Sequence, residues 1–125
     1  LFSEMDSLAK LHKVIAADTT VLSAEEAFAA ATTGGAKVLG LADTGTLQPG
    51  KVADIIIVDL NKPHLTPFYN RDSLVYCAKG SDVTTSIIGG KLVMHNRKIL
   101  TFDIEETMAY VNDLSVSTAQ LSKLN

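Results

Sequence analysis

The sequence predicts an α+β fold in which helices fill the N-terminal half and a small sheet follows. Apolar residues recur at steps of three and four in the first part of the chain, a period typical of amphipathic helices. Beyond Lys51 the pattern changes to short runs rich in β-branched residues, which favour strands. The 125 residues are few enough that we expect one domain.

Composition excludes several classes of partner. With 46% hydrophobic and 20% charged residues the chain is ordinary globular material, and its net charge of −3 gives no basic surface for a nucleic acid. No apolar run approaches the roughly 18 residues of a membrane-spanning helix, and no signal peptide is visible. Cys77 is the single cysteine, which excludes an internal disulfide and favours a reducing cytoplasm.

The N-terminal segment is predicted to form an amphipathic helix. Its apolar stripe consists of Leu1, Met5, Leu8, Leu11 and Ile15. The helix is expected to end at the polar residues 18–20.

A second helix is predicted to begin at Ser23, because Ser23 and Glu26 have the S-x-x-E spacing of a capping box. Gly34-Gly35 should interrupt this helix, since each glycine costs about 1 kcal/mol relative to alanine. One further turn over Ala36–Leu39 is expected, with Gly40 in the position just after its C-terminus.

The stretch from Gly45 to Leu60 introduces the sheet. Pro49-Gly50 fits a type II turn, in which proline presets φ and glycine supplies a positive φ. Ile55–Val58 follows as a run of four apolar residues between Asp54 and Asp59, which predicts a short, fully buried strand.

The next segment is predicted to contain a proline-rich loop and a short helix. Two prolines place Asn61–Pro67 in a loop. Asn70 can cap a helix over Arg71–Lys79 that Gly80 would close. A strand through Leu74-Val75-Tyr76 is the alternative, because these residues have β character.

Two turns and a terminal helix complete the chain. Gly89-Gly90 between two β-rich runs predicts a hairpin, and residues 95–97 are expected to turn into a short run at 98–100. Asp103 and Glu106 open a last helix. The face of this helix consists of Ile104, Met108, Val111 and Leu114. The polar tail, Ser115–Asn125, is expected to fray.

The three histidines do not form a recognisable metal or catalytic set. His12, His64 and His95 lie far apart in sequence, and none belongs to an H-x-H or H-E-x-x-H motif. We interpret each as solvated or structural, and we predict no metal ligand in this chain.

The remaining chemical groups are also interpreted as structural. Asp54 is expected to cap a turn and Asp59 to leave the core, rather than to act as acid and base. Glu25-Glu26 and Glu105-Glu106 occupy first helical turns, where the helix dipole favours anions. Cys77 lacks the neighbours of a nucleophile, and neither glycine pair belongs to a phosphate loop. No catalytic or cofactor-binding residue is therefore predicted.

Several motifs resemble the amidohydrolase superfamily. The pattern Gly45-x-Leu47-x-x-Gly50-x-x-Ala53-Asp54, followed by apolar residues and Asp59, is similar to the family's late strand segment. The flanking stretches that also resemble the family are Leu1–Met5, Ala36–Leu41, Val83–Gly90 and Lys91–Met94. The subgroup that the chain resembles is the S-adenosylhomocysteine/5-methylthioadenosine deaminases with the N-ethylammeline- and atrazine-type triazine chlorohydrolases. Dihydropyrimidinase-like and cytosine deaminase-like enzymes are the nearest rivals.

The resemblance covers only the C-terminal quarter to third of a family member. It implies that residues 1–44 are the last helices of a (β/α)8 barrel. It further implies that residues 45–102 are part of a composite β-sandwich with a short helix and hairpin, and that residues 103–125 are a C-terminal helix and tail. The sequence begins at Leu1 rather than at a methionine, which is consistent with an excised fragment.

The resemblance also implies where the chemistry would lie. In the parent enzyme, meaning the whole protein of which this chain would be a part, zinc or iron would activate water to displace ammonia or chloride from a ring carbon. Its ligands, an early H-x-H, two later histidines and an aspartate, would all precede Leu1. The isolated chain is therefore expected to be inactive, with Leu1 and Phe2 at most at the pocket edge.

The expected partners follow from what the fragment would lack. The partners expected for this chain are the missing N-terminal barrel and sandwich strands. A small-molecule substrate is expected only for the whole parent enzyme. Without those strands, the Leu1–Ile15 stripe and the Ile55–Val58 edge predict a homo-oligomer, unless the helices fold back over the sheet and close a private core. The alternative function is a stand-alone, non-enzymatic α+β interaction module. A start codon at or just before Leu1 would favour that alternative.

Overall fold

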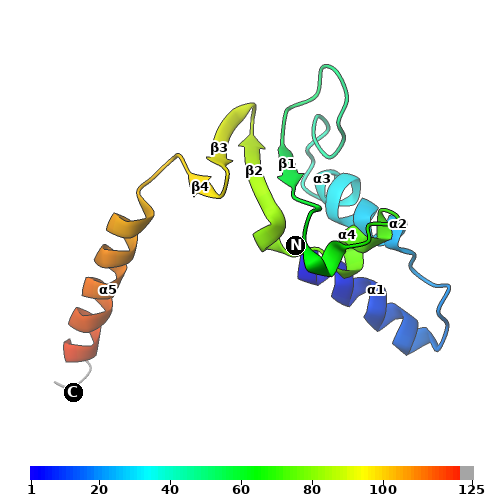
Figure 1. The fold of residues 1–125 in the computed structure, drawn as a ribbon, viewed down its shortest axis with the longest axis horizontal. Coiled ribbons are helices and arrows are strands. Elements are labelled where there is room, and N and C mark those ends of the chain that lie inside the picture. The colour runs from blue at the N-terminus through cyan, green and yellow to red at the C-terminus, as the bar shows by residue number, and fades with distance from the viewer. Residues whose placement is uncertain (122–125) are drawn as a thin grey trace.

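The computed structural model describes residues 1–121 and contains helices and one antiparallel sheet, as predicted (Figure 1). In chain order the helical elements are α1 (Phe2–Ala16), α2 (Ala24–Ala29), η1 (Ala30–Gly34), α3 (Gly35–Val38), η2 (Pro63–Leu65), α4 (Asp72–Tyr76), η3 (Gly80–Asp82) and α5 (Ile104–Leu121). The strands are β1 (Ile55–Val58), β2 (Val83–Ile88), β3 (Lys91–His95) and β4 (Lys98–Ile99), and they lie in that order across the sheet. None of the helices within residues 1–121 is both long and apolar enough to span a bilayer.

The helices α1, α2 and α4 pack on one another and form the core. Its buried residues are Met5, Ala9, Ala24, Ala27 and Val75. Three of these are alanines, and small side chains permit close approach of the helix backbones. The predicted stripe of α1 is only partly used, because Leu11 and Ile15 remain 58% and 81% exposed.

The predicted capping box at the start of α2 is confirmed. The backbone N–H of Glu26 donates to Ser23 Oγ at 3.2 Å, and the backbone N–H of Ser23 donates to Glu26 Oε2 at 2.7 Å. These bonds satisfy two amides that the first turn of a helix leaves free.

The prediction that Gly34-Gly35 interrupts the helix is wrong. Both glycines have helical φ angles, −65° and −59°, and α2 continues through the π-helical segment η1 into α3. A Cβ on Gly34 would lie 3.2 Å from the carbonyl oxygen of Ala29, so glycine accommodates the wide turn instead of breaking it.

The expected end of this helix is confirmed at Gly40, whose φ is +70°. The N–H of Leu41 donates to the oxygen of Ala36 at 2.9 Å, and the N–H of Gly40 donates to the oxygen of Lys37 at 3.2 Å. This pair of bonds is the Schellman motif.

The strand predicted at Ile55–Val58 is confirmed as β1, but the expectation that it is fully buried is wrong. Ile56 and Ile57 are 53% and 52% exposed. The reason is that β1 is an edge strand with β2 as its neighbour in the sheet. Adjacent side chains point to opposite faces of a strand, so within the described residues both faces of the sheet are open at β1.

The predicted turns around the sheet are confirmed. Gly50 has a φ of +86°, and the N–H of Lys51 donates to the oxygen of Gln48 at 3.2 Å, as a type II turn requires. Gly89 and Gly90 join β2 to β3 with φ angles of +55° and +77°. Two positive φ angles in a two-residue hairpin loop follow the right-handed twist of the strands.

The helix predicted over Arg71–Lys79 is confirmed in type but is shorter, and the strand alternative is wrong. α4 ends at Tyr76, and Gly80 begins η3 instead of closing α4. The predicted cap by Asn70 is wrong in position, because Arg71 is the N-cap of α4 and makes no side-chain cap hydrogen bond. Asn70 lies one residue earlier, and its Oδ1 accepts the N–H of Asp72 at 3.1 Å. The predicted proline-rich loop contains the single turn η2.

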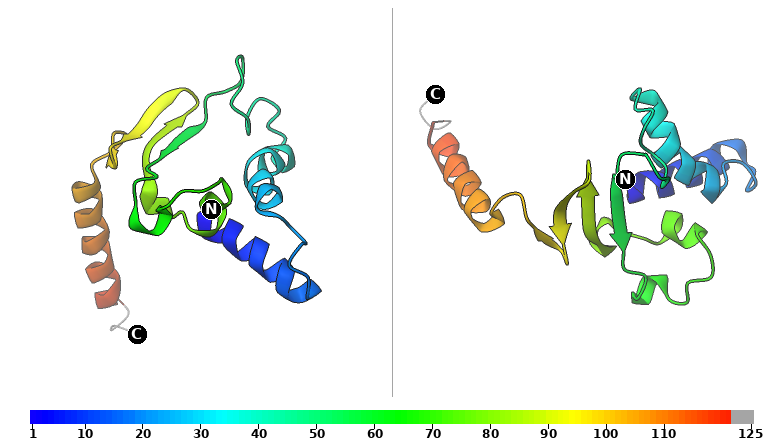
Figure 2. Two further views of the ribbon diagram at one scale, coloured as in Figure 1. Left: turned by 45° about the vertical axis from the view of Figure 1, so that its right-hand side comes forward. Right: turned by 90° about the horizontal axis from the view of Figure 1, so that it is seen from above.

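The last helix, α5, begins as predicted after Asp103, whose Oδ1 accepts the N–H groups of Glu105 and Glu106 at 2.9 and 3.0 Å. The helix continues past Ser115 to Leu121, so the expected fraying is wrong over those residues. The rest of the predicted tail, residues 122–125, lies outside the described residues. In Figures 1 and 2, α5 and the cluster α1–α4 stand on opposite sides of the sheet.

Candidate functional site

A buried carboxylate is the feature that most resembles a functional site. Asp82 is the last residue of η3, immediately before β2, and only 2% of it is exposed. A buried charge must be paired or hydrogen-bonded to be tolerated, so its partners define the site.

The partners of Asp82 are a histidine and a backbone amide. His64 Nε2, from η2, lies 2.9 Å from Asp82 Oδ2, and the N–H of Lys79 donates to the same oxygen at 2.8 Å. The hydrogen bond from His64, supported by that of Lys79, holds the pKa of Asp82 below its ordinary value of 3.8 against the raising effect of burial.

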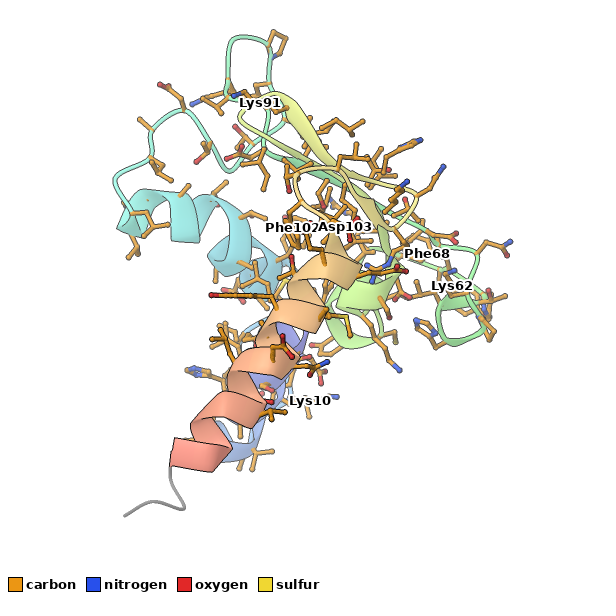
Figure 3. The ribbon with its side chains drawn as sticks, turned by 90° about the vertical axis from the view of Figure 1, so that its left-hand side faces the viewer. Lys10, Lys62, Phe68, Lys91, Phe102 and Asp103 are labelled. Atoms are coloured by element: carbon orange, nitrogen blue, oxygen red, sulfur yellow. The ribbon has the colours of Figure 1, made fainter. Side chains whose placement is uncertain are left out.

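Two further groups complete what we call the His64–Asp82 junction. Lys62 Nζ lies 2.9 Å from Asp59 Oδ2, and this hydrogen bond, with one from the N–H of Asn61, lowers the pKa of Asp59. Arg97 Nη1 donates to the carbonyl oxygens of residues 80 and 83 at 3.1 and 3.0 Å. Figure 3 shows Lys62 on the loop that leaves β1. The junction therefore joins η2, the start of β2 and the β3–β4 turn.

The hydrogen bonds of the His64–Asp82 junction hold neighbouring segments together. Within residues 1–121, the junction lacks the nucleophile that a catalytic site of this kind needs. Nucleophilic catalysis by a histidine–carboxylate pair needs a serine, threonine or cysteine within hydrogen-bond reach of the histidine. Among the described residues, no such side chain is hydrogen-bonded to His64. The pair fixes loop and strand relative to each other.

The structure keeps the other two histidines apart from this junction. His12 is exposed on α1, and His95 Nδ1 lies 3.4 Å from Thr85 Oγ1. Within the described part of the chain, no three histidine, cysteine, aspartate or glutamate side chains are placed to hold a metal ion. These residues therefore do not fit a metal centre.

The remaining residues considered from sequence have local structural roles or none. Asp54 Oδ1 accepts the N–H of Gly89 at 2.7 Å, so it supports the hairpin turn across the sheet rather than the turn beside it. Cys77 is an exposed free thiol. Leu1 is 75% exposed, whereas Phe2 packs against the helical core.

The role of Asp82 was missed by the sequence interpretation. Its partner His64 is 18 residues away, so no short-range spacing reveals the pair. The one local signal is an acidic residue three positions after Lys79, at the end of a single helical turn.

A small pocket lies between α2 and α4. It has a volume of about 90 Å³ and is lined by Ala24, Glu25, Phe28, Arg71, Asp72 and Leu74. Ligand sites for small organic molecules typically measure about 300–1,000 Å³, so this pocket is too small to enclose one.

Comparison with known proteins places these observations in a family. The sequence model of the amidohydrolase family matches residues 1–93. The chain is 51% identical over 117 residues to a 5-methylthioadenosine/S-adenosylhomocysteine deaminase of Syntrophus aciditrophicus, a match that spans 92% of the chain and 26% of that relative. It is 48% identical over 109 residues to a 5′-deoxyadenosine deaminase of Methanosarcina acetivorans, spanning 86% and 25%.

Solved structures give the same result. A zinc-bound adenosine deaminase from Xanthomonas campestris superposes with a TM-score of 0.89 at 34% identity, over 95% of this chain and 28% of that one. A zinc complex of the atrazine chlorohydrolase TrzN from Arthrobacter aurescens TC1 superposes with a TM-score of 0.80 at 25% identity, over 91% and 26%. The chain thus spans about a quarter of the length of these proteins.

Proposed function

This chain belongs to the amidohydrolase family, and on that premise we propose that it is the C-terminal portion of a larger, metal-dependent hydrolase. The parent would act on C–N or C–Cl bonds of purine- or triazine-like rings. Relatives named as deaminases at 51% and 48% identity favour displacement of an amine over displacement of chloride. The free thiol of Cys77 agrees with a cytoplasmic parent.

We assign three parts of the parent to this chain. Residues 1–44 would be the last helices of its (β/α)8 barrel, residues 45–102 part of its β-sandwich, and residues 103–125 its C-terminal helix and tail. The quarter-length match to the zinc-bound adenosine deaminase at a TM-score of 0.89 supports an origin inside a larger fold.

The observation that most supports this proposal is the number of large apolar side chains left in water by well-formed elements. Examples from three different elements are Ile15, Ile56 and Met108, which are 81%, 53% and 61% exposed. Extensive exposed apolar surface marks interfaces. The missing barrel and sandwich strands of the parent are the partners that we propose for these surfaces.

The chain alone would have no hydrolase activity. Its described residues do not fit a metal centre, and the His64–Asp82 junction lacks a nucleophile. We therefore propose that any divalent metal of the parent is held by residues outside this chain. The residues described here would support the fold and take no direct part in the chemistry.

A chimaeric enzyme tests the proposal. This chain would replace the matching 26% of the S. aciditrophicus deaminase, and turnover of 5-methylthioadenosine would be compared with that of the intact relative and of the isolated chain. We expect the chimaera to deaminate the substrate and the isolated chain not to. An unfolded or inactive chimaera, or turnover by the isolated chain, would contradict the proposal. A start codon at or just before Leu1 in the gene would favour the stand-alone interaction module instead.

A further inference from the structure

The helix α5 stands apart from the rest of the described chain. It is 18 residues long, and within residues 1–121 it packs closely on no other helix or strand. Figures 1 and 2 show it beyond β4, on the side of the sheet away from α1–α4, and Figure 3 shows Phe102 and Asp103 at its N-terminal end.

One face of α5 is apolar. Ile104, Met108 and Val111 follow one another at steps of four and three, and they are 43%, 61% and 54% exposed. Glu106 and Asp113 lie on the opposite side of the helix. A helix with one apolar stripe normally buries that stripe against another element. Helices of this length in proteins gain most of their stability from such packing rather than from intrinsic propensity.

The superposition on the zinc-bound adenosine deaminase includes most of α5. It leaves 5% of this chain unmatched, whereas α5 makes up 18 of 125 residues, about 14%. Most of α5 therefore has a superposed counterpart in that enzyme, where 72% of the chain lies outside the matched quarter. That larger portion is available to cover the apolar face.

We propose that the apolar face of α5, formed by Ile104, Met108 and Val111, docks on the part of the parent enzyme that lies outside this chain. The inference rests on the proposed function. It adds that α5 is the helix through which this C-terminal quarter contacts the rest of the enzyme. A second copy of this chain is the competing occupant. The matched placement of α5 in the adenosine deaminase favours the remainder of the same polypeptide, because α5 already has that placement within one chain.

The test measures amide hydrogen exchange in α5 of the chimaera described above. Met108→Asp with Val111→Asp places two charges on the apolar face, and Ala109→Asp with Tyr110→Asp places the same two charges on the opposite side of the helix. We expect α5 to exchange slowly in the unmodified chimaera and in the control. In the Met108→Asp, Val111→Asp variant α5 should exchange at least tenfold faster, with the rest of the protein unchanged.

Each other outcome has a definite meaning. The docking inference is overturned if the amides of α5 exchange at the same rate in the two double variants. It is also overturned if they exchange as fast in the unmodified chimaera as in the isolated chain. Both outcomes leave the proposed function intact. An unmodified chimaera that neither folds nor deaminates overturns the proposed function, and the inference with it. Protection of α5 that depends on protein concentration assigns the face to a second copy and overturns the inference. Met108→Ala with Val111→Ala, which preserves helix propensity, repeats the test if the charged variant does not fold, and α5 must again exchange faster.

Discussion

Nε2 of His64 lies 2.9 Å from Oδ2 of Asp82, and the N–H of Lys79 donates to that same oxygen at 2.8 Å. The pair joins residues 18 positions apart and places the proline-rich loop against the end of η3, immediately before β2. One carboxylate oxygen thus fixes two backbone segments, and its removal should affect the fold rather than a reaction.

Replacing Asp82 by alanine should therefore destabilise the protein. The change removes a charged acceptor that two donors share. Because His64 and Lys79 are partly open to water, we expect a total loss of about 1–3 kcal/mol. Urea unfolding of the isolated chain would measure the loss. Asp43→Ala removes an exposed carboxylate and should change the free energy of unfolding by less than about 0.5 kcal/mol. Equal stability of the two variants would show that the junction contributes nothing.

The same carboxylate should make stability depend on pH in the acid range. The pKa of Asp82 in the folded protein is below 3.8, so the unfolded chain binds its proton first as the pH falls. The stability that it contributes is present above pH 3.8 and is lost as the pH falls through the lower, folded value. Unfolding free energies of the natural chain and of Asp82→Asn, measured from about pH 2.5 to 6, should converge toward the acid end. A constant difference across this range would contradict the assignment.

The positive φ at Gly50 should be costly for any other residue. Gly50→Ala places a Cβ in a backbone conformation with φ of +86°, at a cost of about 1–2 kcal/mol, although no atom lies within 4 Å of that Cβ. Gly80→Ala is the matched control, because its Cβ also meets nothing within 4 Å and its φ is not positive. It should be neutral or stabilising, by up to about 1 kcal/mol. Thermal unfolding of both variants distinguishes conformational strain from crowding.

The isolated chain should self-associate in solution. β1 has an open edge and two half-exposed isoleucines, and the stripe of α1 leaves Leu11 and Ile15 in water. Without the partners proposed above, these surfaces are covered at lowest cost by another copy of the chain. Sedimentation equilibrium at micromolar concentration should give the mass of a dimer or larger assembly. A monomer mass over the whole concentration range would contradict this expectation.

Features determined by neighbouring residues could be predicted from the sequence. The capping box of Ser23 and Glu26, the turn at Pro49-Gly50 and the hairpin at Gly89-Gly90 each depend on a few adjacent residues, and all three are confirmed. In each case local hydrogen bonds or a required sign of φ restrict the backbone strongly.

Features determined by distant contacts could not be predicted in the same way. The exposure of Ile56 and Ile57 depends on how many strands flank β1, and the role of Asp82 depends on a histidine in another loop. Gly34-Gly35 is a third feature that the local sequence did not predict. The unfavourable helix propensity of two glycines did not end the helix, which continues through them by way of the wide turn η1.

Arg97 determines how a force on the last helix would travel through the molecule. α5 is tethered to the sheet through β4, which has two residues and would peel away easily on its own. The guanidinium of Arg97 binds the carbonyl oxygens of Gly80 and Val83, so the β3–β4 turn is anchored to the beginning of β2 as well as to its own neighbour. Tension on α5 would then reach the centre of the sheet through residues 101–103 and Leu100, whose N–H donates to the oxygen of Val93 in β3 at 2.9 Å.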